Sequence, residues 1–285
     1  MLSPEELRQI RRLSVQAGRR VDSLLAGEYR SAFKGSGMEF EEVRAYVPGD
    51  DVRRIDWNVT ARTGEAFIKQ FREERELTLL ICLDVSGSVR FGSGGADGRT
   101  DKRLQMARVA GGLAYAALRT GDRVGLLSFS DSVHHFLPPR RSRGHAWAVI
   151  RSAFEHHGEP GGTDLAGAHA YAAKVLTRRA VVVLLSDFVS PRPFDSELGA
   201  LVRRHRTNAF LFHDPRESAM PGSGTITLRD AETGAVRTVD LSAARAARST
   251  DVRLAELRRR GVRASAIATN EDAFNKLHQH FLSAR

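Results

Sequence analysis

The stretch Leu77-Thr78-Leu79-Leu80-Ile81-Cys82-Leu83-Asp84-Val85-Ser86-Gly87-Ser88 decides the fold. Residues 77–83 are almost continuously apolar, which is typical of a strand that is buried on both faces of a parallel sheet. Three oxygen-bearing side chains, those of Asp84, Ser86 and Ser88, follow where this strand ends. Ligands of open α/β sheets bind in the crevice beyond the carboxyl ends of the strands. The stretch therefore predicts a central strand that delivers polar groups to a binding site.

A second apolar run, residues 180–185, predicts another buried strand, and Asp187 follows its end. Thr163 lies in a Gly-rich segment, residues 158–164, just before a helical pattern that begins near Leu165. Because the carboxyl ends of parallel strands share one edge of the sheet, we expect the three segments to meet there. The candidate metal site consists of Asp84, Ser86, Ser88, Thr163 and Asp187.

Hydroxyl and carboxylate oxygens are hard ligands, which suit Mg²⁺, Mn²⁺ or Ca²⁺ better than Zn²⁺ or copper. Mg²⁺ is the first choice. If the carboxylates act mainly through water, the cation keeps an open position that an acidic group of another molecule could fill. Two other interpretations stay open. Asp-x-Ser-x-Ser also occurs in turns where the side chains cap local backbone groups, and the hydroxyls could bond to one another and to water.

Three short motifs carry a resemblance to a known site. Asp84-x-Ser86-x-Ser88, Gly162-Thr163-Asp164 and Ser186-Asp187 resemble the metal-ion-dependent adhesion site of von Willebrand factor A domains. The resemblance implies that the hydroxyls of Ser86, Ser88 and Thr163 are direct or near-direct ligands. It also implies that Asp84 and Asp187 act largely through water.

A longer signature lies upstream, in Glu42-Val43-Arg44-x-Tyr46-x-x-Gly49-Asp50-Asp51-x-Arg53-x-Ile55-Asp56-Trp57, followed by Ala61-Arg62. It resembles the bacterial family called domain of unknown function 58, and the likeness extends from about Phe33 to the C-terminus through residues 121–126, 138–140 and 230–234. The resemblance implies a von Willebrand A-like core. It also implies a role beside MoxR-type AAA+ ATPases in assembling or activating other proteins.

The rest of the chain predicts an α/β fold with a doubly wound, mostly parallel, Rossmann-like sheet of about six strands. A small N-terminal appendage, residues 1–76, combines a helix up to about Ala26 with a β segment, and residues 77–285 form the von Willebrand A-like domain. The expected strands are residues 77–83, 123–129, 133–137, 180–185, 208–212 and 262–267, with 133–137 antiparallel at the edge. Helices are expected at residues 102–119, 144–155, 165–176, 194–204, 242–260 and from 271, and a hairpin at 225–228 and 235–239.

The appendage is dense in charged residues, which could form a paired network that fastens it to the core or a surface for a partner. We favour the structural role, and we expect Trp57 to be a packing anchor because an indole buries a large apolar area.

Composition limits the classes of function. The net charge is +10 over 285 residues, but it is spread along the chain and lacks the concentrated basic stripe with interleaved aromatics of a nucleic-acid binder. The two arginine clusters at residues 140–143 and 258–260 could face an acidic partner, but we favour a solvated helix or loop face for both. We therefore do not expect nucleic acid as a partner. No run approaches the ~20 apolar residues that span a bilayer, so we expect no membrane contact and a cytoplasmic location. The single cysteine, Cys82, is expected to be buried.

Enzyme motifs are missing from the sequence: it has no phosphate-binding loop, no His-Glu-x-x-His and no Gly-x-Ser-x-Gly. We therefore predict a metal-dependent protein-binding module that is not an enzyme. Its partner would supply an acidic side chain and would be a MoxR-type AAA+ ATPase or a client protein. The alternative is a metal-dependent hydrolase, in which the cation polarises a substrate oxygen and activates water.

Overall fold

The computed structural model describes residues 38–73, 77–91, 101–155, 161–218, 224–229, 234–240 and 249–282. The helix expected near the N-terminus, up to about Ala26, lies outside the described residues. The chain divides into two compact units, of which the smaller spans Phe33–Leu77 and the larger contains the chain from Thr78 onward.

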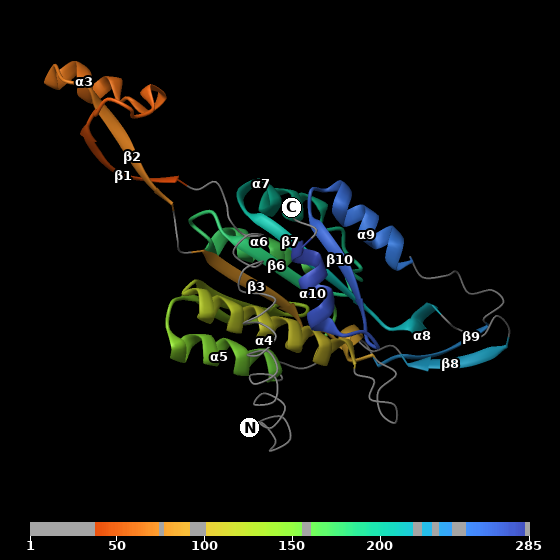
Figure 1. The fold of residues 1–285 in the computed structure, drawn as a ribbon. Coiled ribbons are helices and arrows are strands. Elements are labelled where there is room, and N and C mark those ends of the chain that lie inside the picture. The colour runs from red at the N-terminus through yellow and green to blue at the C-terminus, as the bar shows by residue number, and fades with distance from the viewer. Residues whose placement is uncertain are drawn as a thin grey trace. The chain divides into compact units, whose positions relative to one another are not determined.

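A six-stranded sheet forms the centre of the larger unit, with the strand order β10-β7-β6-β3-β4-β5. Five strands are parallel, and β5 pairs antiparallel with β4 at the edge. This confirms the mostly parallel, Rossmann-like α/β fold that the sequence predicts (Figure 1). The strands are β3 (Thr78–Asp84), β4 (Arg123–Phe129), β5 (Val133–Arg140), β6 (Val181–Ser186), β7 (Arg206–His213) and β10 (Arg263–Ala268).

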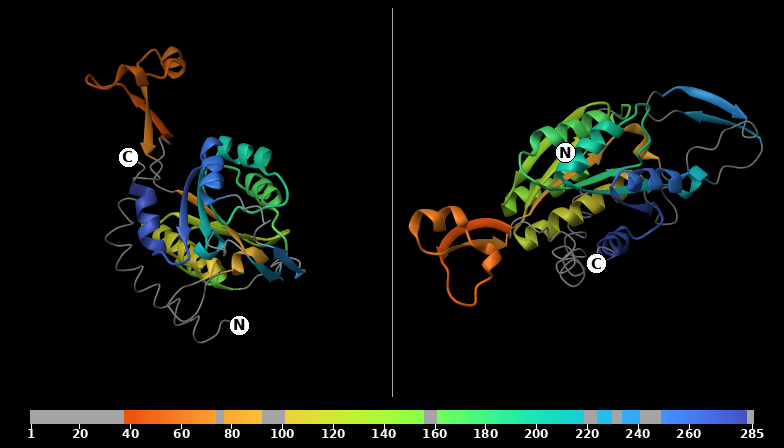
Figure 2. Two further views of the ribbon diagram at one scale, coloured as in Figure 1. Left: turned by 90° about the vertical axis from the view of Figure 1, so that its right-hand side faces the viewer. Right: turned by 90° about the horizontal axis from the view of Figure 1, so that it is seen from above.

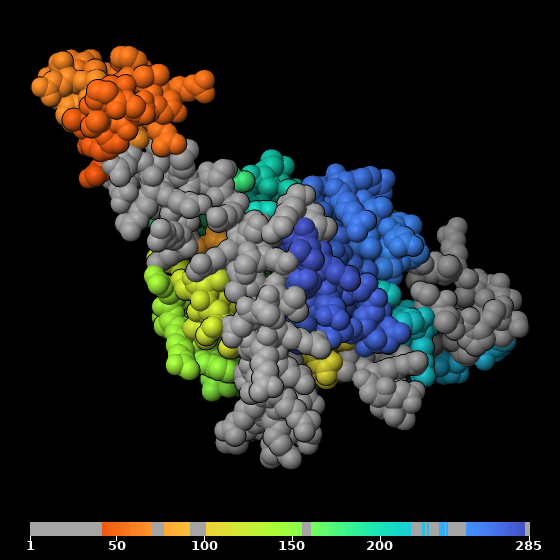
Figure 3. All heavy atoms as spheres, in the orientation of Figure 1, coloured from red at the N-terminus to blue at the C-terminus, as the bar shows by residue number. Residues whose placement is uncertain are grey.

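Helices cover both faces of the sheet, which explains why β3 and β6 are apolar at nearly every position. One layer contains α4 (Lys102–Thr120), α5 (Arg143–Phe154) and α10 (Ala273–Leu282), and the other contains α6 (Leu165–Val175), α7 (Asp195–Arg204) and α9 (Thr250–Arg259). Figure 2 shows the two layers on opposite sides of the strands. In the space-filling view the blue atoms of residues 249–282, which include α9, β10 and α10, form a continuous surface (Figure 3). None of the helices in the described part of the chain is long and apolar enough to cross a membrane.

The strand register decides which residues reach the binding edge. Leu83 pairs with Leu185, and Ser186 pairs with Leu211. Asp84 pairs with Phe129 at the end of β4. The segments after β3, β6 and β7 therefore leave the sheet at the same edge, which we call the carboxyl edge. The opposite edge, where the parallel strands begin, is called the amino edge.

Two short elements lie among these segments. The 3₁₀ helix η3 (Gly87–Arg90) follows β3, and the one-turn helix α8 (Pro215–Ser218) follows β7. The expected hairpin is present as β8 (Thr225–Arg229) and β9 (Val236–Asp240), which pair antiparallel.

The smaller unit contains two antiparallel strands, β1 (Met38–Ala45) and β2 (Phe67–Glu73), with η2 (Val52–Arg54) and α3 (Trp57–Thr63) between them. The guanidinium of Arg44 donates two hydrogen bonds to Asp50, at 2.8 and 2.7 Å. Asp56 caps α3 and pairs with Lys69 at 3.5 Å. These charge pairs are internal to the unit, so they hold its own turns in place.

The expectation for Trp57 is wrong. Its side chain is 70% exposed, so it does not anchor the packing of the unit. Trp57 is the first residue of α3, directly after the capping Asp56, and none of the described residues of α3 is buried. The large apolar area of an indole was the only basis for the expectation, and area by itself does not decide which way a side chain faces.

Gly125 in β4 offers a test of the pairing between β4 and β5. A Cβ at this position would lie 2.6 Å from the backbone oxygen of Leu137 and 2.7 Å from the backbone nitrogen of Pro139. Because both atoms belong to the backbone, Gly125→Ala is expected to destabilise the fold by about 1–3 kcal/mol. Gly144, near the start of α5, is the matched control, since a Cβ there meets nothing within 4 Å. Gly144→Ala should be neutral or stabilise by up to ~1 kcal/mol. Urea unfolding followed by circular dichroism compares the two, and equal stabilities would contradict the expectation.

Candidate functional site

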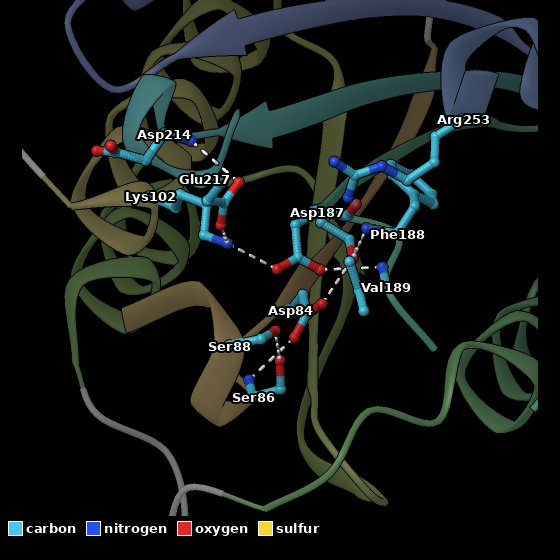
Figure 4. Close-up of polar contacts among 11 residues, drawn as sticks. Asp84, Ser86, Ser88, Lys102, Asp187, Phe188, Val189, Asp214, Glu217 and Arg253 are labelled. Atoms are coloured by element: carbon cyan, nitrogen blue, oxygen red, sulfur yellow. Dashed lines mark hydrogen bonds and ion pairs between the residues drawn. The ribbon is translucent and has the colours of Figure 1, made fainter. Parts of the chain in front are cut away.

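Asp84 ends β3 and is completely buried, with 0% of its surface exposed. Its Oδ1 accepts a hydrogen bond from the backbone N–H of Ser86 at 2.9 Å, and its Oδ2 accepts one from the hydroxyl of Ser186 at 2.6 Å. The carboxylate therefore fixes the turn after β3 and joins the end of β3 to the end of β6 (Figure 4).

The hydroxyls of Ser86 and Ser88 point toward each other, with their oxygens 3.2 Å apart. Ser86 is buried and Ser88 is partly exposed. Ser86 is the N-cap of η3, and Ser88 is the second residue of its single turn. Two hydroxyl oxygens thus lie next to the buried carboxylate of Asp84, as Figure 4 shows.

Asp187 follows β6 and is 1% exposed. Its Oδ1 accepts a hydrogen bond from the N–H of Val189 at 3.0 Å. Between these two residues Phe188 adopts a φ of 53°, in the left-handed region that non-glycine residues rarely occupy. The N–H of Phe188 donates to the hydroxyl of Ser186 at 2.8 Å. This strained turn directs both Ser186 and Asp187 toward the β3 loop, and such strain is typical of functional sites.

Thr163 is 3% exposed and lies in a loop that contacts both of the other segments. Gly87 donates to the backbone oxygen of Gly161 at 3.2 Å, and the hydroxyl of Ser190 donates to the backbone oxygen of Thr163 at 3.3 Å. The structure therefore brings together the three segments that carry Asp84, Ser86, Ser88, Thr163 and Asp187.

Burial and the nearby Asp187 raise the pKa of Asp84 to about 7, against the opposing effect of its hydrogen bonds from Ser186 and Ser86. Its donors are the hydroxyls of Ser186 and Ser86 and the backbone N–H of Ser86, and among the described residues no cationic group contacts it. A buried carboxylate with neutral donors only is costly to ionise. A cation beside Asp84 would remove this cost.

Sequence reasoning missed Lys102, the first residue of α4, which is 2% exposed. Its Nζ donates to Oδ2 of Asp187 at 2.9 Å and to Oε1 of Glu217 in α8 at 2.6 Å. Burial lowers the pKa of Lys102, but the two carboxylates outweigh it and hold the pKa above its ordinary value. The sequence does carry a signal, because a lysine in the first turn opposes the helix dipole and needs an acidic partner from elsewhere.

Arg253 in α9 and Asp214 after β7 complete the surroundings (Figure 4). The guanidinium of Arg253 donates to the backbone oxygen of Asp187 at 2.6 Å. The backbone N–H of Asp214 donates to Oε2 of Glu217 at 3.2 Å, which holds the second oxygen of the carboxylate that binds Lys102. Two helices, α4 and α9, therefore contact Asp187, and α8 contacts it indirectly through Lys102.

The residues fit a hard divalent cation. Within the described part of the chain, no group of three or more His, Cys, Asp or Glu side chains could hold a metal, so a site here depends on hydroxyl oxygens. Ser86 and Ser88 supply them beside Asp84, and Thr163 carries a third hydroxyl on the loop that contacts Gly87. The carboxylates of Asp84 and Asp187 already accept hydrogen bonds from protein groups. They would therefore contact a cation through water molecules and not directly. This donor set favours Mg²⁺, Mn²⁺ or Ca²⁺.

The fold and the site define an α/β protein with an oxygen-rich cluster at the carboxyl edge of a parallel sheet. The chain belongs to the family described as "Protein of unknown function DUF58", whose profile matches residues 42–260. Uncharacterized proteins of Mycobacterium tuberculosis and Mycobacterium bovis are 33% identical over 236 residues, which cover 82% of this chain and 73% of each relative.

Solved structures resemble this chain at lower identity. An aerotolerance-related membrane protein from Bacteroides fragilis is 15% identical, with a TM-score of 0.49 over 73% of this chain and 98% of that one. BatB from Bacteroides thetaiotaomicron is 14% identical, with a TM-score of 0.48 over the same shares. A mussel byssus matrix protein with a zinc-occupied MIDAS motif is 14% identical, with a TM-score of 0.37 over 48% of this chain and 38% of that one. Likenesses this distant carry no functional argument.

The raised pKa of Asp84 predicts how stability depends on pH. Between the ordinary pKa of 3.8 and about 7, the folded state retains a proton that the unfolded state has released, so this group's contribution to stability falls as pH rises. Asp84→Asn keeps an acceptor for Ser86 and removes the charge. In metal-free buffer at pH 8 the variant is expected to be more stable than the parent by roughly 2–4 kcal/mol, and at pH 4 the difference should nearly vanish.

Urea unfolding at several pH values measures this difference. Asp131→Asn is the control, because Asp131 lies at the same edge and its side chain is 61% exposed. A stability difference for Asp84→Asn that stays constant with pH would show that Asp84 titrates normally.

Proposed function

We propose that the protein is a metal-dependent protein-binding module. Ser86, Ser88 and Thr163 bind a divalent cation directly, and Asp84 and Asp187 hold it through water. The cation keeps one position open for a carboxylate of another molecule. Mg²⁺ is the expected cation, and Mn²⁺ or Ca²⁺ could replace it.

One observation carries the proposal: the buried Asp84 carboxylate has no cationic partner among the described residues, although a pair of hydroxyls lies beside it. Asp187, by contrast, contacts Lys102. A divalent cation at the hydroxyl pair would neutralise Asp84 and would use two oxygens that lie 3.2 Å apart. This arrangement supports the von Willebrand A-like interpretation of the fold.

Catalysis is not part of the proposal. The strongest nucleophile candidate is Ser130, whose hydroxyl lies 2.5 Å from Nε2 of His134. Asp131 approaches the same ring nitrogen, at 3.7 Å, whereas a triad needs the carboxylate on the other nitrogen to orient the imidazole. A screen of the metal-loaded protein with phosphoester and peptide substrates tests this point, and activity that is lost in Asp187→Ala would favour the hydrolase.

The partner in this proposal is a MoxR-type AAA+ ATPase or a client of one, and the location is the cytoplasm. The resemblance of the signature in residues 42–62 supports the ATPase role. The open position on the cation supports an acidic side chain as the contacting group, because a carboxylate is a hard ligand and would complete the coordination.

Metal binding is tested by titration calorimetry of chelator-stripped protein with Mg²⁺, Mn²⁺ and Ca²⁺. Ser88→Ala and Thr163→Ala each remove one direct ligand, so the affinity is expected to fall by about tenfold or more. Ser132→Ala is the control, since Ser132 is an exposed serine of the β4–β5 turn and its loss should leave the affinity unchanged. Absence of binding to the parent protein would refute the metal site.

Partner binding is tested with a purified MoxR-type AAA+ ATPase from the same source, by surface plasmon resonance. Binding is expected in Mg²⁺ and should be lost with chelator or in Asp84→Asn, while Ser132→Ala binds like the parent. The reason is that the cation itself forms the contact. An affinity that is the same with and without chelator would contradict a metal-mediated contact.

A further inference from the structure

Lys102 places a permanent positive charge inside the proposed metal site. Its Nζ is bound between Asp187, at 2.9 Å, and Glu217, at 2.6 Å. The side chain is 2% exposed, and the ring of Phe91 lies 6.0 Å from Nζ. Water therefore screens this charge weakly.

The position of Asp187 does not depend on Lys102 alone. The Oδ1 atom of Asp187 accepts a hydrogen bond from the backbone N–H of Val189 at 3.0 Å. The backbone oxygen of Asp187 accepts one from the guanidinium of Arg253 at 2.6 Å. Loss of the ammonium would therefore leave the carboxylate oriented by Val189 and its backbone held by Arg253. The loss of Lys102 would therefore change mainly the charge beside Asp187.

We propose that Lys102 is an affinity-determining residue, an internal ammonium that competes with the divalent cation for the negative charge of Asp187. The inference rests on the proposed function of the same site. The ammonium of Lys102 pairs with the carboxylate of Asp187 when no metal is bound, and it keeps the affinity of the site for the metal low. A partner's carboxylate then contributes a larger share of the binding, so cation and partner bind cooperatively.

Glu217 counterbalances Lys102. Its Oε1 contacts the ammonium while Oε2 accepts from the backbone N–H of Asp214, so α8 holds a compensating negative charge beside Lys102. Removal of that charge leaves the positive charge of Lys102 shared with Asp187 only. Substitutions at Lys102 and at Glu217 should therefore change the metal affinity in opposite directions, which a purely structural role for both residues would not do.

The test uses the full chain, stripped of metal and titrated calorimetrically with Mg²⁺ and Mn²⁺. Lys102→Met keeps the length of the side chain and removes the charge, and the affinity is expected to rise about tenfold or more, given the strength of charge interactions at such distances in a poorly screened site. Glu217→Gln is expected to lower the affinity several-fold. The double variant should return toward the parent. Lys174→Met, at an exposed lysine of α6, is the matched control and should leave the affinity unchanged.

The melting temperatures of the variants, with and without metal, give a second test. Without metal, Lys102→Met leaves the carboxylates of Asp187 and Glu217 without their shared ammonium, so its melting temperature should fall. Saturating Mg²⁺ should restore it, with a larger rise than in the parent. If Lys102→Met does not fold without metal, Glu217→Gln still decides, because Glu217 is 28% exposed and tolerates replacement.

The outcomes separate the two proposals. Suppose that the parent binds the cations. If Lys102→Met then binds them no more tightly than the parent, or if Glu217→Gln binds them as tightly as the parent or more so, the role of Lys102 is refuted and the metal site stands. If neither the parent nor any variant binds Mg²⁺ or Mn²⁺, the metal site is refuted and Lys102 has no such role. Opposite shifts at Lys102 and Glu217 support the inference.

Discussion

The burial of the Asp84 carboxylate at the end of the central strand is the constraint on which the site depends. A buried carboxylate must find donors, and Asp84 finds them in the Ser86 backbone and the Ser186 hydroxyl. The first fixes the loop with the two serine hydroxyls, and the second ties β3 to β6. Phe188 then takes a left-handed conformation, and Asp187 turns toward the same place. The cost of this arrangement is an excess of buried negative charge, which Lys102 compensates on the Asp187 side.

The topology also distributes charge between the two edges. In a parallel sheet the crossover helices begin at the carboxyl edge, and capping residues such as Asp101, Asp164 and Ser249 lie there. The same helices end at the amino edge, where basic residues suit the negative end of the helix dipole. Arg140 of the antiparallel β5 reaches that edge too, since it pairs with Val124. The arginine clusters at residues 140–143 and 258–260 are thus placed away from the candidate site, although the sequence shows only a scattered excess.

Most of the sheet could be predicted from the sequence because each strand is marked by a pattern of apolar residues that are neighbours in the chain. Apolar runs such as those that became β3 and β6 have one stable environment, a layer covered on both faces, and their bounds agree to within a few residues. Proximity of the segments after β3 and β6 was predictable for a related reason, since parallel strands share an edge, whereas Thr163 precedes α6 and follows no parallel strand. The prediction for Trp57 was wrong. A large apolar area favours burial of a side chain, but burial also requires neighbouring elements that can pack against it.

The sequence by itself determined the α/β alternation, the position of the polar residues at strand ends and the hydroxyl-rich character of the candidate site. Only the tertiary structure decided how charge is balanced there. Lys102, Asp187 and Glu217 come from α4, the β6 loop and α8, and no pattern along the chain relates residues that are 85 and 115 positions apart. Hydrophobic periodicity is set by neighbours in sequence, whereas the energy of a buried charge is set by neighbours in space.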